Sequence, residues 1–353
     1  MTKRTRKMLF IASAAIFVAA VVPLLMYTAG YRLTSELKIT KTGGLFITAP
    51  QVNSDIFVDN IFKKKTNFLQ NNLFIQNLTP RSYSVLVAKE GYWPWFKKIE
   101  VEPKMVAEAR AFMVPQDPKW DIIANGRKFV SIQISPDQKT IAVLDEKGNG
   151  NYHLLFYLAE TNSILAEDDG QTKSALSFPS KNINLLWLDN KTFVQSRTKI
   201  AEAALDFEKK TVKASLIAKL PQEFQTGEPS QLEEKKIISS SEKTAVTVNS
   251  QNNEIQAQWL DKETRLPYYF EGKEMTLLKS QFHIDKIAFF PYREDVIIFA
   301  ADTQGIFALE FDNRNNSRLV QPVYKGKKPN FVVSEKDGKI YLIDESVFFS
   351  TKL

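Results

Sequence analysis

Few side chains in this sequence of 353 residues have the types and spacing that catalysis or metal binding requires. It contains two histidines, His153 and His283, and no cysteine. Thiolate metal sites and disulfides are therefore excluded, and imidazole ligands are scarce. No Gly-x-Ser-x-Gly elbow, phosphate-binding loop or His-Glu-x-x-His motif is present. We therefore predict no catalytic residue, no cofactor and no metal site.

Two acidic segments partly resemble calcium loops. Residues 145–150 (DEKGNG) place Lys147 where such a loop needs an oxygen ligand, and the distal glutamate is absent. This pattern favours a hairpin turn. Residues 167–170 (EDDG) pair carboxylates, and a solvated loop is the simpler interpretation. Acidic residues are frequent along the chain, so a glycosidase pair is not excluded, but no pair stands out.

Residues 92–96 (YWPWF) concentrate aromatic rings. Exposed flat rings are good platforms for sugars or partner proteins, so Tyr92, Trp93 and Trp95 form a candidate partner surface. The alternative, which the pattern favours, is that these rings alternate into a core. Residues 63–65 (KKK) are either a contact for anionic polymer or lipid headgroups, or a solvated loop, and the loop is favoured.

The element that must position everything else is the apolar run at residues 8–27, twenty residues with no charge. As a helix it would be about 30 Å long, which matches the hydrocarbon core of a bilayer. Four basic residues precede the run: Lys3, Arg4, Arg6 and Lys7. Positive charge stays on the cytoplasmic side, so we expect a cytoplasmic tail at 1–7 and an extracytoplasmic body.

A cleaved signal peptide is the alternative interpretation of this segment. The run is longer than the apolar region of a signal peptide, and it ends in bulky residues rather than at a small-x-small cleavage site. We therefore expect an uncleaved transmembrane helix at 8–30 that binds the lipid bilayer, followed by a spacer at 31–42. The expected localisation is the cell membrane, with a single pass.

Composition indicates folded domains. The chain is 44% hydrophobic and 25% charged, which is enough to form cores. Its formal charge is +7, but four of these charges precede the apolar run, so the remainder is nearly balanced. The net positive charge therefore reflects the orientation of the apolar segment in the membrane, and we predict no nucleic-acid partner.

Residues 43–115 are predicted to form a small β-sandwich. Short β-rich runs are separated by Pro, Asn and Asp: 45–49, 55–59, 73–76, 82–88 and 96–102. The last two alternate between apolar and polar residues, as half-buried strands do, and sustained helical periodicity is absent.

This order of strands resembles a PEGA domain, a surface-layer-associated β module. The resemblance rests on residues 44–45 (GL), 56–60 (IFVDN), 78–80 (LTP), 83–85 (YSV) and the turn at 89–92 (KEGY). The chain departs from the family pattern at two places. Of the four residues whose one-letter codes spell the family's name, only Pro50 is present. Arg81-Ser82 replaces the glycine that usually precedes the next strand. Gly91 suits the turn because glycine accepts positive φ.

Residues 116–353 are predicted to form a propeller-like domain. A Pro-containing linker at 113–119 spans the boundary between this domain and the β-sandwich. A strand, a Ser-Pro-Asp turn, a strand, a Gly/Asn turn and another strand succeed one another between residues 129 and 162. Weaker repeats of this pattern begin near residues 182, 237, 284 and 331, at a spacing of about 40–55 residues that is typical of four-stranded blades.

The turn Ser135-Pro136-Asp137 with the following Ile141-Ala142-Val143 resembles TolB-like or WD40-like propeller blades. We predict five or six blades, and a sandwich or an incomplete array is the alternative. Segments 165–178 and 220–234 match the repeat weakly, and they are either long loops or hidden strands. The predicted fold is thus an all-β ectodomain behind one N-terminal transmembrane helix.

Two hypotheses about function follow. The first is a non-enzymatic, membrane-anchored surface protein that presents a β-sandwich and a propeller to other proteins or to envelope glycans. The alternative is an exported hydrolase whose propeller channel carries two converging carboxylates. A signalling role would need a separate membrane partner, because seven cytoplasmic residues leave no room for an output domain.

Overall fold

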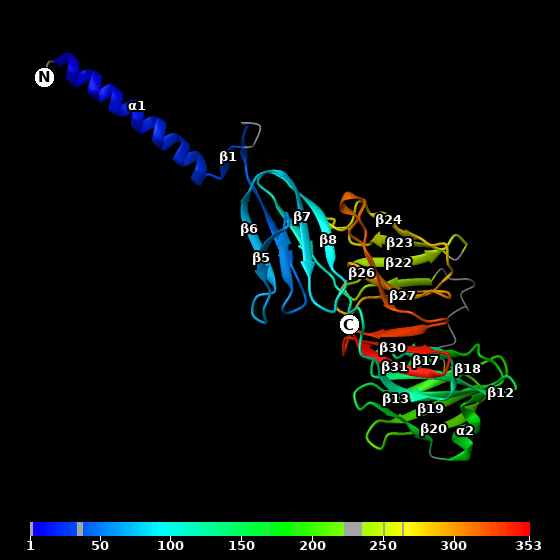
Figure 1. Ribbon diagram of the computed structural model, residues 1–353. Coiled ribbons are helices and arrows are strands. Elements are labelled where there is room, and N and C mark those ends of the chain that lie inside the picture. The colour runs from blue at the N-terminus through cyan, green and yellow to red at the C-terminus, as the bar shows by residue number, and fades with distance from the viewer. Residues whose placement is uncertain are drawn as a thin grey trace. The chain divides into compact units, whose positions relative to one another are not determined.

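The computed structural model describes residues 3–33, 38–167, 169–188, 190–221, 235–249, 251–262 and 265–353. The chain forms two compact units. Unit 1 comprises Met1–Met113 and Arg314–Ser317, and unit 2 comprises Val114–Asn313 and Arg318–Leu353. Apart from the N-terminal helix, both units are built almost entirely from β-strands (Figure 1). The prediction of an all-β fold behind one apolar N-terminal helix is confirmed.

The N-terminal helix is α1, Lys3–Thr28, which contains Pro23 without being interrupted by it. Its most apolar 18-residue stretch has a mean hydropathy of 2.6, and none of that stretch is buried. At about 1.5 Å per residue the helix exceeds the roughly 30 Å of a bilayer core. The four basic residues at its start are exposed. The helix is therefore a candidate membrane anchor or signal sequence.

A short hairpin follows α1. It consists of β1, Tyr31–Leu33, and β2, Ile39–Lys41, which pair antiparallel. The backbone N–H and the hydroxyl of Thr42 each donate to Gly30 O at 2.9 Å. These bonds hold Gly30, two residues after the helix, next to Thr42, which precedes the first strand of the β-sandwich.

Two sheets form the β-sandwich of unit 1. The first has the order β6-β3-β9, with β3 (Gly43–Thr48) between antiparallel β6 (Asn72–Leu78) and parallel β9 (Val106–Arg110). The second has the order β5-β4-β7-β8, from β5 (Ile61–Lys65), β4 (Asp55–Val58), β7 (Arg81–Ala88) and β8 (Trp95–Val101). Each sheet buries one face, because alternate side chains of a strand point to opposite sides.

Two local features of unit 1 bear on the sequence predictions. Gly91 has a φ of 77°, so the expected glycine turn before β8 is present. The expected loop at residues 63–65 was wrong, because these lysines belong to β5, an edge strand. Charged side chains commonly protect such edges from further pairing, which is why the segment has the composition of a loop.

Unit 2 contains five sheets of four or five strands, and in each the main strands follow one another in sequence (Figure 1). The first sheet contains β11 (Lys128–Ile134), β12 (Thr140–Gly148), β13 (Asn151–Leu158), β14 (Ser163–Ile164) and β16 (Ser177–Phe178). The second contains β17 (Asn184–Leu188), β18 (Lys191–Gln195), β19 (Ile200–Asp206), β20 (Thr211–Ile217) and β15 (Ala166–Glu167).

The third sheet contains β21 (Lys235–Ile238), β22 (Thr244–Asn249), β23 (Glu254–Trp259) and β24 (Glu274–Lys279). The fourth contains β25 (Ile284–Phe289), β26 (Val296–Ala301), β27 (Gly305–Glu310) and β28 (Val320–Tyr324). The fifth contains β29 (Asn330–Ser334), β30 (Lys339–Asp344), β31 (Val347–Lys352) and β10 (Asp121–Asn125). Such repetition of four-stranded sheets is the arrangement of a β-propeller.

The fifth sheet joins the two ends of unit 2. Its outer strand β10 comes from the start of the unit and pairs antiparallel with β31 at the end of the chain. Phe348 of β31 packs within this joint, with ring centroids 6.2 Å from Phe129 and 5.5 Å from Tyr157. Backbone pairing within the fifth sheet thus joins the two ends of unit 2, and the first and fifth sheets share an apolar core.

The weakly repeating segments have different outcomes. Segment 165–178 contains two short strands, β15 and β16, and a helix of six residues, α2 (Gly170–Ala175). Residues 222–234 lie outside the described residues, so the prediction for 220–234 stays untested.

Candidate functional site

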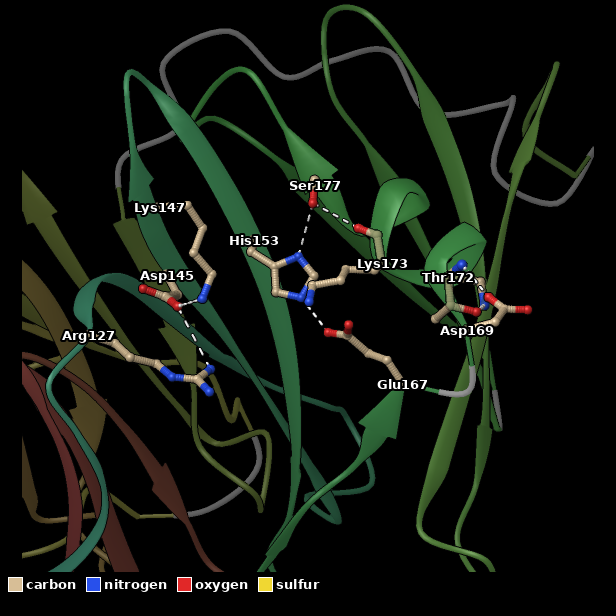
Figure 2. Close-up of polar contacts among 10 residues, drawn as sticks. Arg127, Asp145, Lys147, His153, Glu167, Asp169, Thr172, Lys173 and Ser177 are labelled. Atoms are coloured by element: carbon tan, nitrogen blue, oxygen red, sulfur yellow. Dashed lines mark hydrogen bonds and ion pairs between the residues drawn. The ribbon is translucent and has the colours of Figure 1, made fainter.

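A chain of hydrogen-bonded polar side chains, with a buried histidine at its centre, lies where the sheets of β13 and β15 meet (Figure 2). His153 on β13 is its centre, with a side chain only 4% exposed. Its Nδ1 lies 3.1 Å from Ser177 Oγ on β16, and its Nε2 contacts Glu167 Oε1 on β15. The Ser177 hydroxyl in turn donates to Lys173 O at 2.7 Å. The chain thus connects two neighbouring sheets.

The composition of this cluster is that of a Ser–His–acid triad, but the proton positions differ from those of a hydrolase. Since the Ser177 hydroxyl donates to Lys173 O, its oxygen accepts from His153 Nδ1–H. A nitrogen that carries a proton cannot act as the general base for that serine. With these donor and acceptor roles, His153 Nδ1 does not accept the proton of Ser177.

Asp145 lies beside this chain. It is the cross-strand partner of His153 in the β12–β13 register, and such partners have Cβ atoms about 5 Å apart. The carboxylate is almost fully buried and forms ion pairs with Lys147 at 2.9 Å and Arg127 at 3.8 Å. Its Oδ2 has no partner with hydrogen-bond geometry, so these contacts are electrostatic. Two cations thus offset the cost of burying this charge.

The two segments considered as calcium loops have other roles. Residues 149–150 form the turn of the β12–β13 hairpin, so the preferred prediction for 145–150 is confirmed. Asp169 caps α2, and hydrogen bonds from Thr172 lower the pKa of that carboxyl. Asp168 lies outside the described residues. Among the residues that the structure describes, no group of three His, Asp or Glu side chains is placed to hold a metal ion.

A cleft of about 550 Å³ lies between strands of the first and fifth sheets of unit 2. Its polar lining includes Asp121, Tyr157, Asn162 and Lys339. Tyr157 donates to Asn162 Oδ1 at 2.9 Å, and burial, with smaller contributions from Asp337 and Asp121, raises the pKa of Tyr157 to about 12. A phenol with this pKa stays neutral at physiological pH, so it acts here as a hydrogen-bond donor.

In a propeller the innermost strand of each sheet lies nearest the axis, and in unit 2 these strands are β11, β17, β21, β25 and β29. Their described residues include one acidic residue, Asp285. Next to it, Lys286 donates to Ile132 O at 3.0 Å and to Asn330 Oδ1 at 3.2 Å. This lysine therefore joins three of the innermost strands, β25, β11 and β29.

The structure separates the three aromatic residues of the candidate partner surface. Trp95 is fully buried at the start of β8, as the favoured interpretation of these rings predicts, so it is not part of a partner surface. Trp93 is 37% exposed, and Tyr92 is partly exposed with Lys89 Nζ 4.4 Å from its ring centroid. The surface is reduced to Tyr92 and Trp93.

The fold and the site define an all-β protein with a propeller-like unit and an apolar N-terminal helix. No protein-family model matches the chain, and no curated protein matches it. The resemblance to PEGA and TolB-like domains therefore stays a prediction.

Three solved structures give low similarities. A luciferin-regenerating enzyme is 10% identical with a TM-score of 0.40, over 67% of this chain and 96% of that chain. The calcium-binding protein regucalcin from Agrobacterium tumefaciens is 12% identical with a TM-score of 0.30, over 66% and 93%. A chain of a mitotic checkpoint complex is 13% identical with a TM-score of 0.24, over 75% and 68%. At these TM-scores the similarities carry no information about function.

Proposed function

We propose that this chain is a membrane-anchored, extracytoplasmic surface protein that binds proteins or envelope glycans and has no enzymatic activity. The observation that carries this proposal is α1, which is long and apolar, has no part of its most apolar stretch buried, and begins with four basic residues. In lipid such a helix satisfies its own backbone hydrogen bonds, and its basic end stays in the cytoplasm.

The β-rich units support a role in binding. β-Sandwich modules and propellers offer rigid surfaces and loops, and both protect most of their strand edges from aggregation. We assign unit 1 to a PEGA-like module and unit 2 to a TolB- or WD40-like propeller, on the sequence resemblances and the order of strands. Tyr92 and Trp93 are the aromatic residues that remain available for a partner.

The polar clusters argue against the hydrolase alternative. Ser177 has its hydroxyl proton directed to Lys173 O and not to His153. The described residues of the innermost strands of unit 2 contribute one carboxylate, whereas glycoside hydrolysis ordinarily uses two at roughly 5–10 Å. These observations favour a binding protein over an enzyme.

Affinity capture tests the binding function. The full chain, purified in detergent and immobilised through its C-terminus, is incubated with solubilised envelope proteins and with soluble envelope glycans. We expect one class to be retained and retention to fall for Trp93→Ala. The matched control is Phe282→Ala, an exposed aromatic residue of unit 2. Retention that equals the background for both classes would refute the binding role.

A further inference from the structure

We propose that the β5–β6 surface of unit 1 docks onto the bilayer that holds α1, with its apolar side chains in the headgroup region and its lysines on anionic phospholipids. We define the β5–β6 surface by Ile61, Lys63, Lys65, Phe68 and Leu69, all of which are exposed. The inference rests on the proposed anchor and adds a second membrane contact to it.

The most prominent part of this surface is the turn between β5 and β6. Phe68 is 88% exposed and Leu69 is 87% exposed at its tip. The turn is well ordered by hydrogen bonds: Asn67 Oδ1 accepts from the N–H groups of Leu69 and Gln70 at 3.0 and 2.8 Å. Lys64 Nζ donates to Gln70 Oε1 and to Asn72 O, both at 2.9 Å. Two large apolar side chains are thus held in water on an ordered backbone, which lowers the ordering cost of binding.

The rest of the surface extends this tip into a stripe. β5 and β6 are edge strands of the two sheets, and Lys64 of β5 donates to Asn72 O at the start of β6 at 2.9 Å. Asn72 pairs with Thr48, so the tip lies at the opposite end of β3 from Gly43. Ile61 lies at the other end of β5 from Lys65, where it pairs with Val58 at the end of β4.

Charge and shape favour a lipid surface as the occupant. Three consecutive lysines adjoin the apolar side chains, and the only acidic residues between positions 55 and 81 are Asp55 and Asp59, which pair with Lys65 and Arg81. Protein interfaces bury cores depleted of charge, whereas bilayer interfaces accept apolar side chains next to lysines. Protection of an edge strand explains the lysines but not Phe68 and Leu69.

The anchor keeps a bilayer within reach. Gly30 and Thr42 are hydrogen-bonded to each other, so β3 begins close to the end of α1. β3 is six residues long, so the tip lies about 17 Å along the strand from Gly43. The stripe therefore meets the membrane when the sandwich lies on its β5–β6 border, and this contact would fix the orientation of unit 1.

The absence of cysteine makes a site-directed label the direct test. The full chain with Phe68→Cys is labelled with a nitroxide and reconstituted into phosphatidylcholine vesicles with or without phosphatidylglycerol. Its collision with oxygen and with a nickel chelate is then measured by electron paramagnetic resonance. We expect a lipid-like oxygen preference that increases with phosphatidylglycerol. Adding Lys63→Ala should lower the ratio of docked to free label about fivefold. Lys98→Ala, an exposed lysine on β8, should leave the ratio unchanged.

Three outcomes would overturn the proposal. One is a label at position 68 that stays in water in both kinds of vesicle. Another is a ratio of docked to free label that changes neither with phosphatidylglycerol nor with Lys63→Ala. The third is dipolar broadening between labels, which would show that a second copy covers the surface. A separate label at Ile16→Cys reports on the anchor: if it lies in lipid while position 68 lies in water, docking fails and the anchor stands.

Discussion

The hydrogen-bonded pair His153–Glu167 should be a stabilising link between two sheets of unit 2, and a double-mutant cycle measures that role. The variants are Glu167→Ala, His153→Phe and the double substitution. The pair joins β13 to β15, and the two side chains are 4% and 19% exposed. Removing one partner of a buried hydrogen bond leaves the other without compensation, which costs about 1–3 kcal/mol and more where a group is charged. The partial exposure of Glu167 lowers our expectation for Glu167→Ala to about 2–3 kcal/mol.

The double variant should lose less stability than the sum of the single variants. Once His153 is replaced by an apolar ring, no polar atom is left without a partner, and such replacements are often neutral. We therefore expect a coupling energy of about 2 kcal/mol. For a domain of this size, each kcal/mol lowers the Tm by about 2–4 °C, so Glu167→Ala should lower it by about 4–12 °C.

Differential scanning calorimetry of the full chain in detergent measures these changes, since the transition of unit 2 is followed as a heat-absorption peak. The control cycle uses Lys191–Glu202, a cross-strand pair on the surface of unit 2, whose coupling should be about 0.2–1 kcal/mol. A coupling at His153–Glu167 no larger than that of the control would refute the structural role that we assign to the pair.

Three further changes test other parts of the account. Trp95→Ala should destabilise unit 1 by about 3–5 kcal/mol because it empties a fully buried site, whereas Trp93→Ala should cost well under half of that, as chemical unfolding would show. Although burial favours the neutral acid, hydrogen bonds from Ser84 N–H and Arg81 lower the pKa of Asp59. The stability this gives is present above about pH 4 and is lost as the pH falls through the lowered pKa, so Asp59→Asn should flatten the acid limb of a stability–pH curve. Gly305→Ala should lower the Tm of unit 2, since its φ is 122° and an added Cβ would lie 2.1 Å from Tyr324 O; an unchanged Tm would contradict that packing.

Local patterns predicted much of the fold. The apolar run predicted α1, and period-two alternation predicted β7 and β8. Extending the alternation of β8 back from Ile99 would have placed Trp95 on the buried face. Lys97, which interrupts that pattern, is itself buried and donates to Ser317 O at 2.5 Å. A contact with a residue so distant in sequence cannot be derived from a local pattern.

The candidate site and the joint of unit 2 depend on such long-range pairing. The hairpin turn at residues 149–150 sets the register that places His153 opposite Asp145, and this register is derivable from the sequence. The contacts of His153 with Glu167 and Ser177 depend on how β15 and β16 meet other strands. The pairing of β10 with β31 joins the two ends of unit 2, and its register is not encoded in either strand alone.

The most direct test of the membrane-anchored surface protein uses a single cysteine on an exposed strand of unit 2. Leu216→Cys on β20 provides it in a chain that has no other cysteine. Intact cells are treated with a membrane-impermeant maleimide, and the membrane-bound protein is then assayed for label. We expect complete labelling without detergent. Labelling only after the membrane is permeabilised would place unit 2 in the cytoplasm and contradict the account.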